Sequence, residues 1–94
     1  MDRVAAIRNR LEQAFVPARL EIRDDSALHA GHAGAASGGG HFTVLIVADR
    51  FAGMSALERH RLVYASLGDL MPKEIHALSM KALTPEESAR PAGG

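Results

Sequence analysis

The chain has 94 residues and no formal net charge, because 11 Lys and Arg residues balance 11 Asp and Glu residues when histidine is neutral. It contains no cysteine, which excludes a disulfide scaffold, a thiol redox centre and a metal site built on its own sulfur ligands. The balanced charge argues against a strongly basic surface for nucleic acids, and the length predicts one domain with a modest core.

No segment of the sequence has the length of a membrane span. The longest apolar run, residues 42–48, is far shorter than the roughly 20 residues that cross a bilayer. No apolar stretch of the secretory kind follows the first three residues, Met1-Asp2-Arg3. We therefore expect a cytoplasmic protein that does not bind membranes.

A helix and a strand are expected at the start of the chain. Apolar residues recur with helical period from Val4 to Phe15, Asp2 can cap this helix, and Pro17 stops it. Apolar and charged residues then alternate over residues 19–23, which is typical of a strand with one wet face.

Residues 26–41 differ in composition from the rest of the chain. They consist almost entirely of Ala, Gly, Ser and His and offer little apolar surface to bury. Long segments of this kind are usually functional or disordered. We expect a mobile loop, and three of the five histidines of the chain, His29, His32 and His41, lie in it.

A central strand and a helix are expected next. Residues 42–48 are β-branched and apolar on both faces, which favours a strand in the middle of a sheet. Ser55 and Glu58 form a capping box that opens a helix, and Gly68 is a suitable C-cap for it.

The last third of the chain predicts one more strand. A short helical turn that ends at Pro72 is expected within residues 69–73, followed by a strand over residues 75–83. Residues 84–87 have the composition of a helix start. Residues 89–94 offer nothing to pack and are expected to form a disordered tail.

The order of these elements predicts an α+β fold with one domain over residues 1–88. Two adjacent strands suit a hairpin with a long connection, and the helices before the last strand permit a crossover that makes it parallel to a neighbour. A three-stranded mixed sheet with helices on one face is the economical two-layer arrangement.

The two loop histidines carry a weak metal-binding signal. His29 and His32 are three residues apart and could both face one ion. A flexible pair without a third fixed ligand is more often incidental polarity. No His-Glu-x-x-His motif accompanies them, and no nucleophile elbow is present. We therefore expect no enzyme.

The other histidines have different settings. His76 opens the last strand, and alternation places it on the same face as Leu78 and Met80. The pattern alone favours a core histidine bonded at both nitrogens, and the alternative is a rigid ligand at a strand end. His60 and His41 are expected to be structural.

Six short motifs follow one another along the chain. They are Asp24-Asp25-Ser26, His29-Ala30-Gly31-His32, His41-Phe42, Arg50-Phe51, the run RHRLVY from Arg59 to Tyr64 and the run IHALS from Ile75 to Ser79. Together they resemble the BolA family over roughly residues 2–88, and the combination of the last two runs is specific to that family. The family fold is a class II KH-like domain in the order α-β-β-α-α-β, which agrees with the order predicted above.

The resemblance implies a partner protein without enzymatic activity. BolA proteins pair with monothiol glutaredoxins of the CGFS type and share a [2Fe–2S] cluster with them, for cluster trafficking, assembly or iron sensing. The glutaredoxin cysteine and a glutathione thiol supply sulfur. The BolA protein supplies the strand-start histidine, here His76, and one loop ligand, here His29 or His32. No cofactor is expected in the isolated chain.

Two other functions stay open on the sequence. Some BolA proteins are transcriptional regulators, and weak DNA binding would use Arg50, Arg59 and Arg61. A stand-alone metal-binding domain is the third alternative. The free chain is expected to be a monomer, with a homodimer as the alternative.

Overall fold

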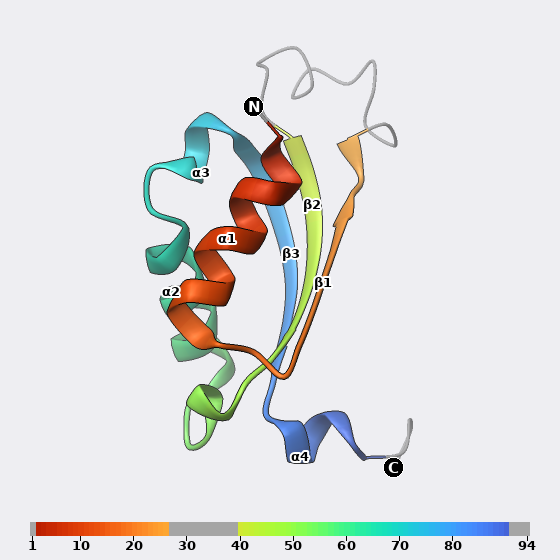
Figure 1. The fold of residues 1–94 in the computed structure, drawn as a ribbon. Coiled ribbons are helices and arrows are strands. Elements are labelled where there is room, and N and C mark those ends of the chain that lie inside the picture. The colour runs from red at the N-terminus through yellow and green to blue at the C-terminus, as the bar shows by residue number, and fades with distance from the viewer. Residues whose placement is uncertain (1, 27–39, 91–94) are drawn as a thin grey trace.

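The computed structural model describes residues 2–26 and 40–90 (Figure 1). The predicted loop therefore lies mostly outside the described residues, together with His29 and His32, and so does the end of the predicted tail. The prediction that the loop extends to residue 41 is wrong, because residues 40 and 41 are already paired as part of a strand. The elements are α1 (Arg3–Phe15), β1 (Arg19–Asp24), β2 (Gly40–Val47), the 3-10 helix η3 (Asp49–Phe51), α2 (Ala56–Leu67), α3 (Leu70–Lys73), β3 (Ile75–Leu83) and α4 (Pro85–Ser88).

The three strands form one mixed sheet in the order β1-β2-β3. β1 pairs with β2 in antiparallel orientation, and β2 pairs with β3 in parallel orientation. A parallel pair needs a crossover, which α2 and α3 provide. The predicted sheet and the central position of the second strand are confirmed.

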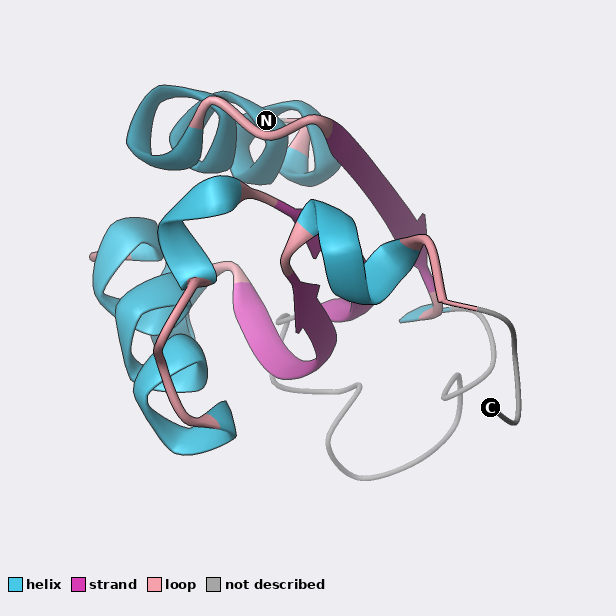
Figure 2. Ribbon diagram, turned by 90° about the horizontal axis from the view of Figure 1, so that it is seen from below, coloured by secondary structure: helices cyan, strands magenta, loops and turns pink. Residues whose placement is uncertain are grey.

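Helices α1 and α2 cover one face of this sheet (Figures 1 and 2). The core lies between that face and the two helices, because the apolar face of each helix is buried against the apolar side of β2. The residues that form this contact are Ile7, Leu11 and Phe15 from α1, Val63 and Leu67 from α2, and Phe42, Val44 and Ile46 from β2.

The helix starts that the sequence predicts are present. The Asp2 side chain accepts a hydrogen bond from the Ala5 N–H at 3.1 Å. Ser55 and Glu58 make both hydrogen bonds of a capping box at the start of α2. Thr84 and Glu87 make a second capping box, which starts α4. These caps satisfy amide groups that have no partner inside the helix.

The prediction that Pro72 ends the short helical turn is wrong, because Pro72 lies inside α3. The preceding residue, Met71, has an extended conformation (φ −98°, ψ 125°), as residues before proline prefer. The backbone therefore kinks before Pro72 and continues for one more turn, in which the Glu74 N–H donates to the Leu70 carbonyl at 2.9 Å.

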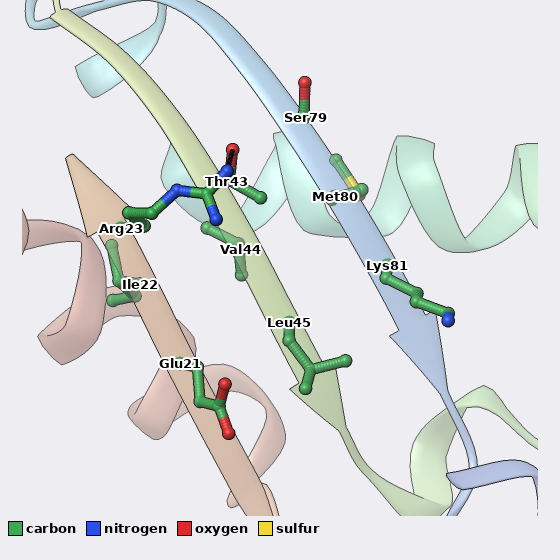
Figure 3. A pocket seen from close by; sticks show the side chains of 9 residues that line it. All are labelled: Glu21, Ile22, Arg23, Thr43, Val44, Leu45, Ser79, Met80 and Lys81. Carbon is green, nitrogen blue, oxygen red and sulfur yellow. Dashed lines mark hydrogen bonds between the residues drawn. The ribbon is translucent and has the colours of Figure 1, made fainter. Parts of the chain in front are cut away.

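The opposite face of the sheet has a shallow hollow that Figure 3 shows from close by. Its two rows of side chains run across the strands, with polar or charged groups around one half-buried leucine. The rows are Arg23–Thr43–Ser79 and Glu21–Leu45–Lys81. None of the helices in the described ranges, 2–26 and 40–90, is long and apolar enough to cross a membrane.

Candidate functional site

His76 lies on a β-bulge at the start of β3. Gly40 pairs with Ile75 and His41 pairs with Ala77, so that His76 is an extra residue on the β3 side. Bulges of this kind redirect a side chain and are frequent beside functional sites. The His76 side chain is exposed as a result.

The prediction of a core histidine is therefore wrong. It assumed unbroken alternation from His76 to Leu78, but Ile75 and Leu78 both face the helices although they are three residues apart. The extra residue shifts the alternation and leaves both His76 and Ala77 exposed. The alternative prediction, a rigid ligand at a strand end, stays a prediction, and the exposed side chain leaves His76 accessible for that role.

The imidazole ring of His41 packs against that of His76. The centroids of the two imidazole rings are 5.1 Å apart, with 43° between the ring planes. The His41 N–H donates to the Ser26 Oγ at 3.1 Å, and its carbonyl accepts from the Asp25 N–H at 2.7 Å. This is the arrangement expected of a residue that orders the end of the loop.

Ser26 connects the end of β1 to the start of β2. Its N–H donates to Asp24 Oδ1 at 2.9 Å. Hydrogen bonds from the Ser26 side chain and backbone lower the pKa of Asp24 below its ordinary value. Ser26 thus fixes the point at which the chain leaves for residues 27–39, and that point lies beside His41 and therefore near His76.

The described residues do not supply a complete metal site. Within residues 2–26 and 40–90, no group of three or more His, Asp or Glu side chains could hold a metal ion. The chain has no cysteine either. A metal or cluster at His76 would therefore need ligands from residues 27–39, where His29 and His32 lie, or from another molecule.

The three arginines predicted for DNA binding do not form one free patch. Arg59 has a side chain that is only 11% exposed, and its Nη1 lies 2.6 Å from Glu87 Oε1. The same guanidinium donates to the carbonyls of Met54 and Ala82 at 3.0 and 2.9 Å. Arg50 donates to the Ala14 carbonyl at 3.0 Å. DNA binding stays a prediction, and Arg61 on α2 is exposed.

His60 lies in α2. It is half-buried and lines a groove between α2, β3 and α4 together with Arg59 and Glu87. The structure places it apart from the His41–His76 pair, since its groove is lined by Met80 to Leu83 rather than by the start of β3. No ligand role follows for His60.

Comparison with known proteins decides the family. A family model described as BolA-like protein matches residues 11–87, which is most of the chain. The chain belongs to the BolA-like family. The solved BolA domain of SufE1 from Arabidopsis thaliana is 43% identical, with a TM-score of 0.81 over 93% of this chain and 96% of that one. The predicted α+β BolA fold is confirmed.

Relatives in the BolA-like family have different names and lengths. BolA-like protein 1 of Mus musculus is 47% identical over 83 residues, which cover 88% of this chain and 58% of the relative. The DNA-binding transcriptional regulator BolA of Escherichia coli is 40% identical over 86% of this chain and 74% of the relative. This chain thus spans somewhat more than half the length of its mammalian relatives.

Two features of this BolA-like domain could not be predicted from apolar periodicity or from local motifs. The His41–His76 contact depends on the bulge, whose only sequence signal is that the apolar residues Ile75 and Leu78 are three apart instead of two. The contact between Arg59 and Glu87 joins two helices and has no local signal at all.

Proposed function

We propose that this BolA-like chain is a non-enzymatic partner of a CGFS monothiol glutaredoxin and shares a [2Fe–2S] cluster with it. The observation that supports the proposal most is the exposed imidazole of His76 on the bulge, next to both ends of the segment that contains His29 and His32. Membership of the BolA-like family agrees with a partner protein.

The donor atoms of the chain fit a shared cluster. Without cysteine, this chain offers iron only nitrogen or oxygen, and sulfur would come from the glutaredoxin cysteine and from glutathione. His76 would be the fixed ligand, and His29 or His32 the second. In such a cluster, the two histidines would bind one iron atom through their imidazole groups. This ligation raises the reduction potential of [2Fe–2S] centres.

Imidazole ligation also makes the assembly sensitive to acid. Iron binds the neutral imidazole, so protons compete with iron for the same nitrogen below about pH 6.5. An acid-labile, partly solvent-exposed site is suited to passing on a cluster or to reporting iron supply, which are the roles in cluster assembly, trafficking and iron sensing that we propose.

The test is the His76→Ala variant, mixed with a CGFS glutaredoxin, glutathione and iron. We expect it to lose the visible circular dichroism and electron paramagnetic resonance signals of nitrogen-ligated iron, because the fixed ligand is gone. The apo fold, followed by amide NMR spectra, should be unchanged, because His76 is exposed.

His60→Ala is the matched control, since it removes a histidine that is not part of the site. It should retain both signals. His29→Ala and His32→Ala, compared with each other, identify the second ligand. Unchanged spectra in His76→Ala would refute the proposed ligand role.

DNA binding is the second candidate function, because one relative is named a DNA-binding transcriptional regulator. The engagement of Arg59 with Glu87 withdraws one of the three predicted arginines from phosphate contacts. Affinity for duplex DNA, measured over a range of salt concentrations, tests this function. A plot of the logarithm of the binding constant against the logarithm of the salt concentration gives a slope. A slope near zero would reject DNA binding, whereas a negative slope of several units would support it.

The cytoplasmic location is likewise a proposal. Two relatives carry the names SufE-like protein 1, chloroplastic/mitochondrial, and Protein BOLA1, chloroplastic, so members of the family are found in more than one compartment. Fractionation of the native source with an antibody against the chain would test it.

A further inference from the structure

His41 and His76 come from different strands, and their rings nevertheless pack against each other. The centroid distance of 5.1 Å and the interplanar angle of 43° lie in the range of favourable aromatic pairs. The contact exists because the bulge moves His76 out of the regular ladder, at the position where His41 pairs with Ala77.

The two partners of this contact differ in how firmly they are held. The His41 backbone is bonded to Ser26 and Asp25, and the His41 side chain is partly buried with its Nε2 atom inside the protein. The His76 side chain is exposed and extends from a bulge. The ring of His41 is therefore held by more of the protein than the ring of His76, which lies at the surface.

We infer that His41 is a positioning residue, whose ring holds the imidazole of His76 in one orientation at the surface. The purpose of this restraint rests on the proposed function, because orientation matters when His76 has to meet an iron atom. A side chain that is already ordered loses less conformational entropy on binding than a freely rotating one.

The contact of His41 with His76 is one of ring against ring. The Nε2 atom of His41 is buried, so it does not lie on the surface that a glutaredoxin would approach. If the ring supplies the restraint, a ring without nitrogen should serve equally well.

The first test uses the apo protein alone and compares the wild type with His41→Phe, His41→Ala and the control His60→Ala. We expect nuclear Overhauser contacts from residue 41 to the His76 ring and a single His76 rotamer in the wild type, in His41→Phe and in the control. In His41→Ala, the His76 side chain should exchange between rotamers, so that its NMR parameters are averaged over them. The amide spectrum of each variant shows whether it has folded.

Two results of this test would overturn the inference. One is a His76 ring that stays in a single rotamer in His41→Ala. The other is averaging in folded His41→Phe, which would show that the nitrogen atoms of His41 and not its ring matter. Neither result depends on a cluster, so the inference can fail while the proposed function stands.

The second test adds a cluster-loaded CGFS glutaredoxin with glutathione as the probe. His41→Ala should bind it about fivefold more weakly, and His41→Phe should stay within about twofold of the wild type, as expected for the loss or retention of one aromatic pair. Equal affinity of His41→Ala and the wild type would overturn the inference. An unchanged cluster spectrum in His76→Ala would instead overturn the proposed function and leave the NMR evidence for ring positioning intact.

Discussion

Gly40 occupies a position that has no room for a side chain. A Cβ atom there would lie 2.5 and 2.7 Å from two ring carbons of Phe42 and 3.0 Å from the Ser26 Oγ. Phe42 is buried in the core and cannot move away freely, and Ser26 holds the His41 N–H. The start of β2 therefore depends on the absence of a Cβ atom.

We predict that Gly40→Ala lowers the free energy of unfolding by about 1–3 kcal/mol, the usual cost of an overpacked core. Urea unfolding followed by circular dichroism measures it. Because the bulge begins at Gly40, the His76 resonances should shift as well. A variant as stable as the wild type would show that the Phe42 ring can move at little cost.

At the scale of single residues, the sequence singled out His76 but did not predict where its side chain points. The motif resemblance led to His76, whereas strand alternation placed it on the wrong face. Alternation assumes one residue per ladder position, and the bulge between Gly40 and His41 breaks that assumption. A bulge depends on pairing with a distant strand, so a local pattern does not reveal it.

At the scale of elements, the end of α1 is strained. Val16 caps this helix in the left-handed conformation, with φ 45° and ψ 58°, which a β-branched residue rarely adopts. Its side chain is 84% exposed and so gains little from packing. The Val16 N–H still donates to the Glu12 carbonyl at 2.9 Å, as in a regular helix cap.

We predict that Val16→Gly raises the free energy of unfolding by about 1 kcal/mol, because glycine adopts this conformation without a steric penalty. The melting temperature should rise by about 4–8 °C, as expected for a domain of this size. Val16→Ala is the matched control and should gain much less, since it keeps a Cβ atom. A lower melting temperature for the glycine variant would show that the Val16 side chain makes a contact that stabilises the fold.

The attachment of α4 depends on an ion pair. The hydrogen bond from Arg59, with support from the Thr84 N–H, lowers the pKa of Glu87 from 4.5 to about 2. A carboxylate with a lowered pKa in the folded state stabilises the fold above its ordinary pKa, and this contribution is lost as the pH falls from 4.5 towards 2.

We therefore predict that the free energy of unfolding of the wild type falls between pH 4.5 and pH 2. Glu87→Gln should have a lower free energy of unfolding than the wild type at pH 6. The decrease between pH 4.5 and pH 2 should be smaller in this variant. Urea unfolding at a series of pH values measures both. Glu86→Gln, at an exposed neighbouring position, should keep the wild-type pH dependence. If Glu87→Gln had the same pH dependence as the wild type, the loss of stability at low pH would come from other carboxylates.

The boundaries of most elements could be predicted because their signals are local. The two members of each capping box, Ser55 with Glu58 and Thr84 with Glu87, lie three residues apart and need no tertiary contact. The role of Arg59 could not be predicted, because its partners on β3 and α4 come together only in the folded chain. An arginine that looked available for DNA is instead part of the packing.

At the scale of the whole molecule, the two faces of the sheet should respond differently to substitution. Val44 and Leu45 are neighbours on β2, but Val44 is fully buried against the helices and Leu45 faces the open hollow in Figure 3. Val44→Thr buries a hydroxyl group and should cost about 1–3 kcal/mol. Leu45→Thr should cost less than about 1 kcal/mol, because its site is partly solvated.

Urea unfolding of both variants at several protein concentrations measures this difference. Equal losses would contradict the two-layer arrangement and would show that something covers the open face in solution. A loss that grows with protein concentration would identify that cover as a second copy of the chain.

The parallel pairing of β2 with β3 has a consequence for the way the chain is synthesised. β1 and β2 are neighbours in sequence order, but β2 has β3 on its other edge, and β3 is complete only when residue 83 has been made. Until then, the backbone groups on one side of the most apolar strand have no hydrogen-bond partner, which invites association between nascent chains. The burden on chaperones should therefore last from the emergence of β2 until β3 has left the ribosome and paired with it.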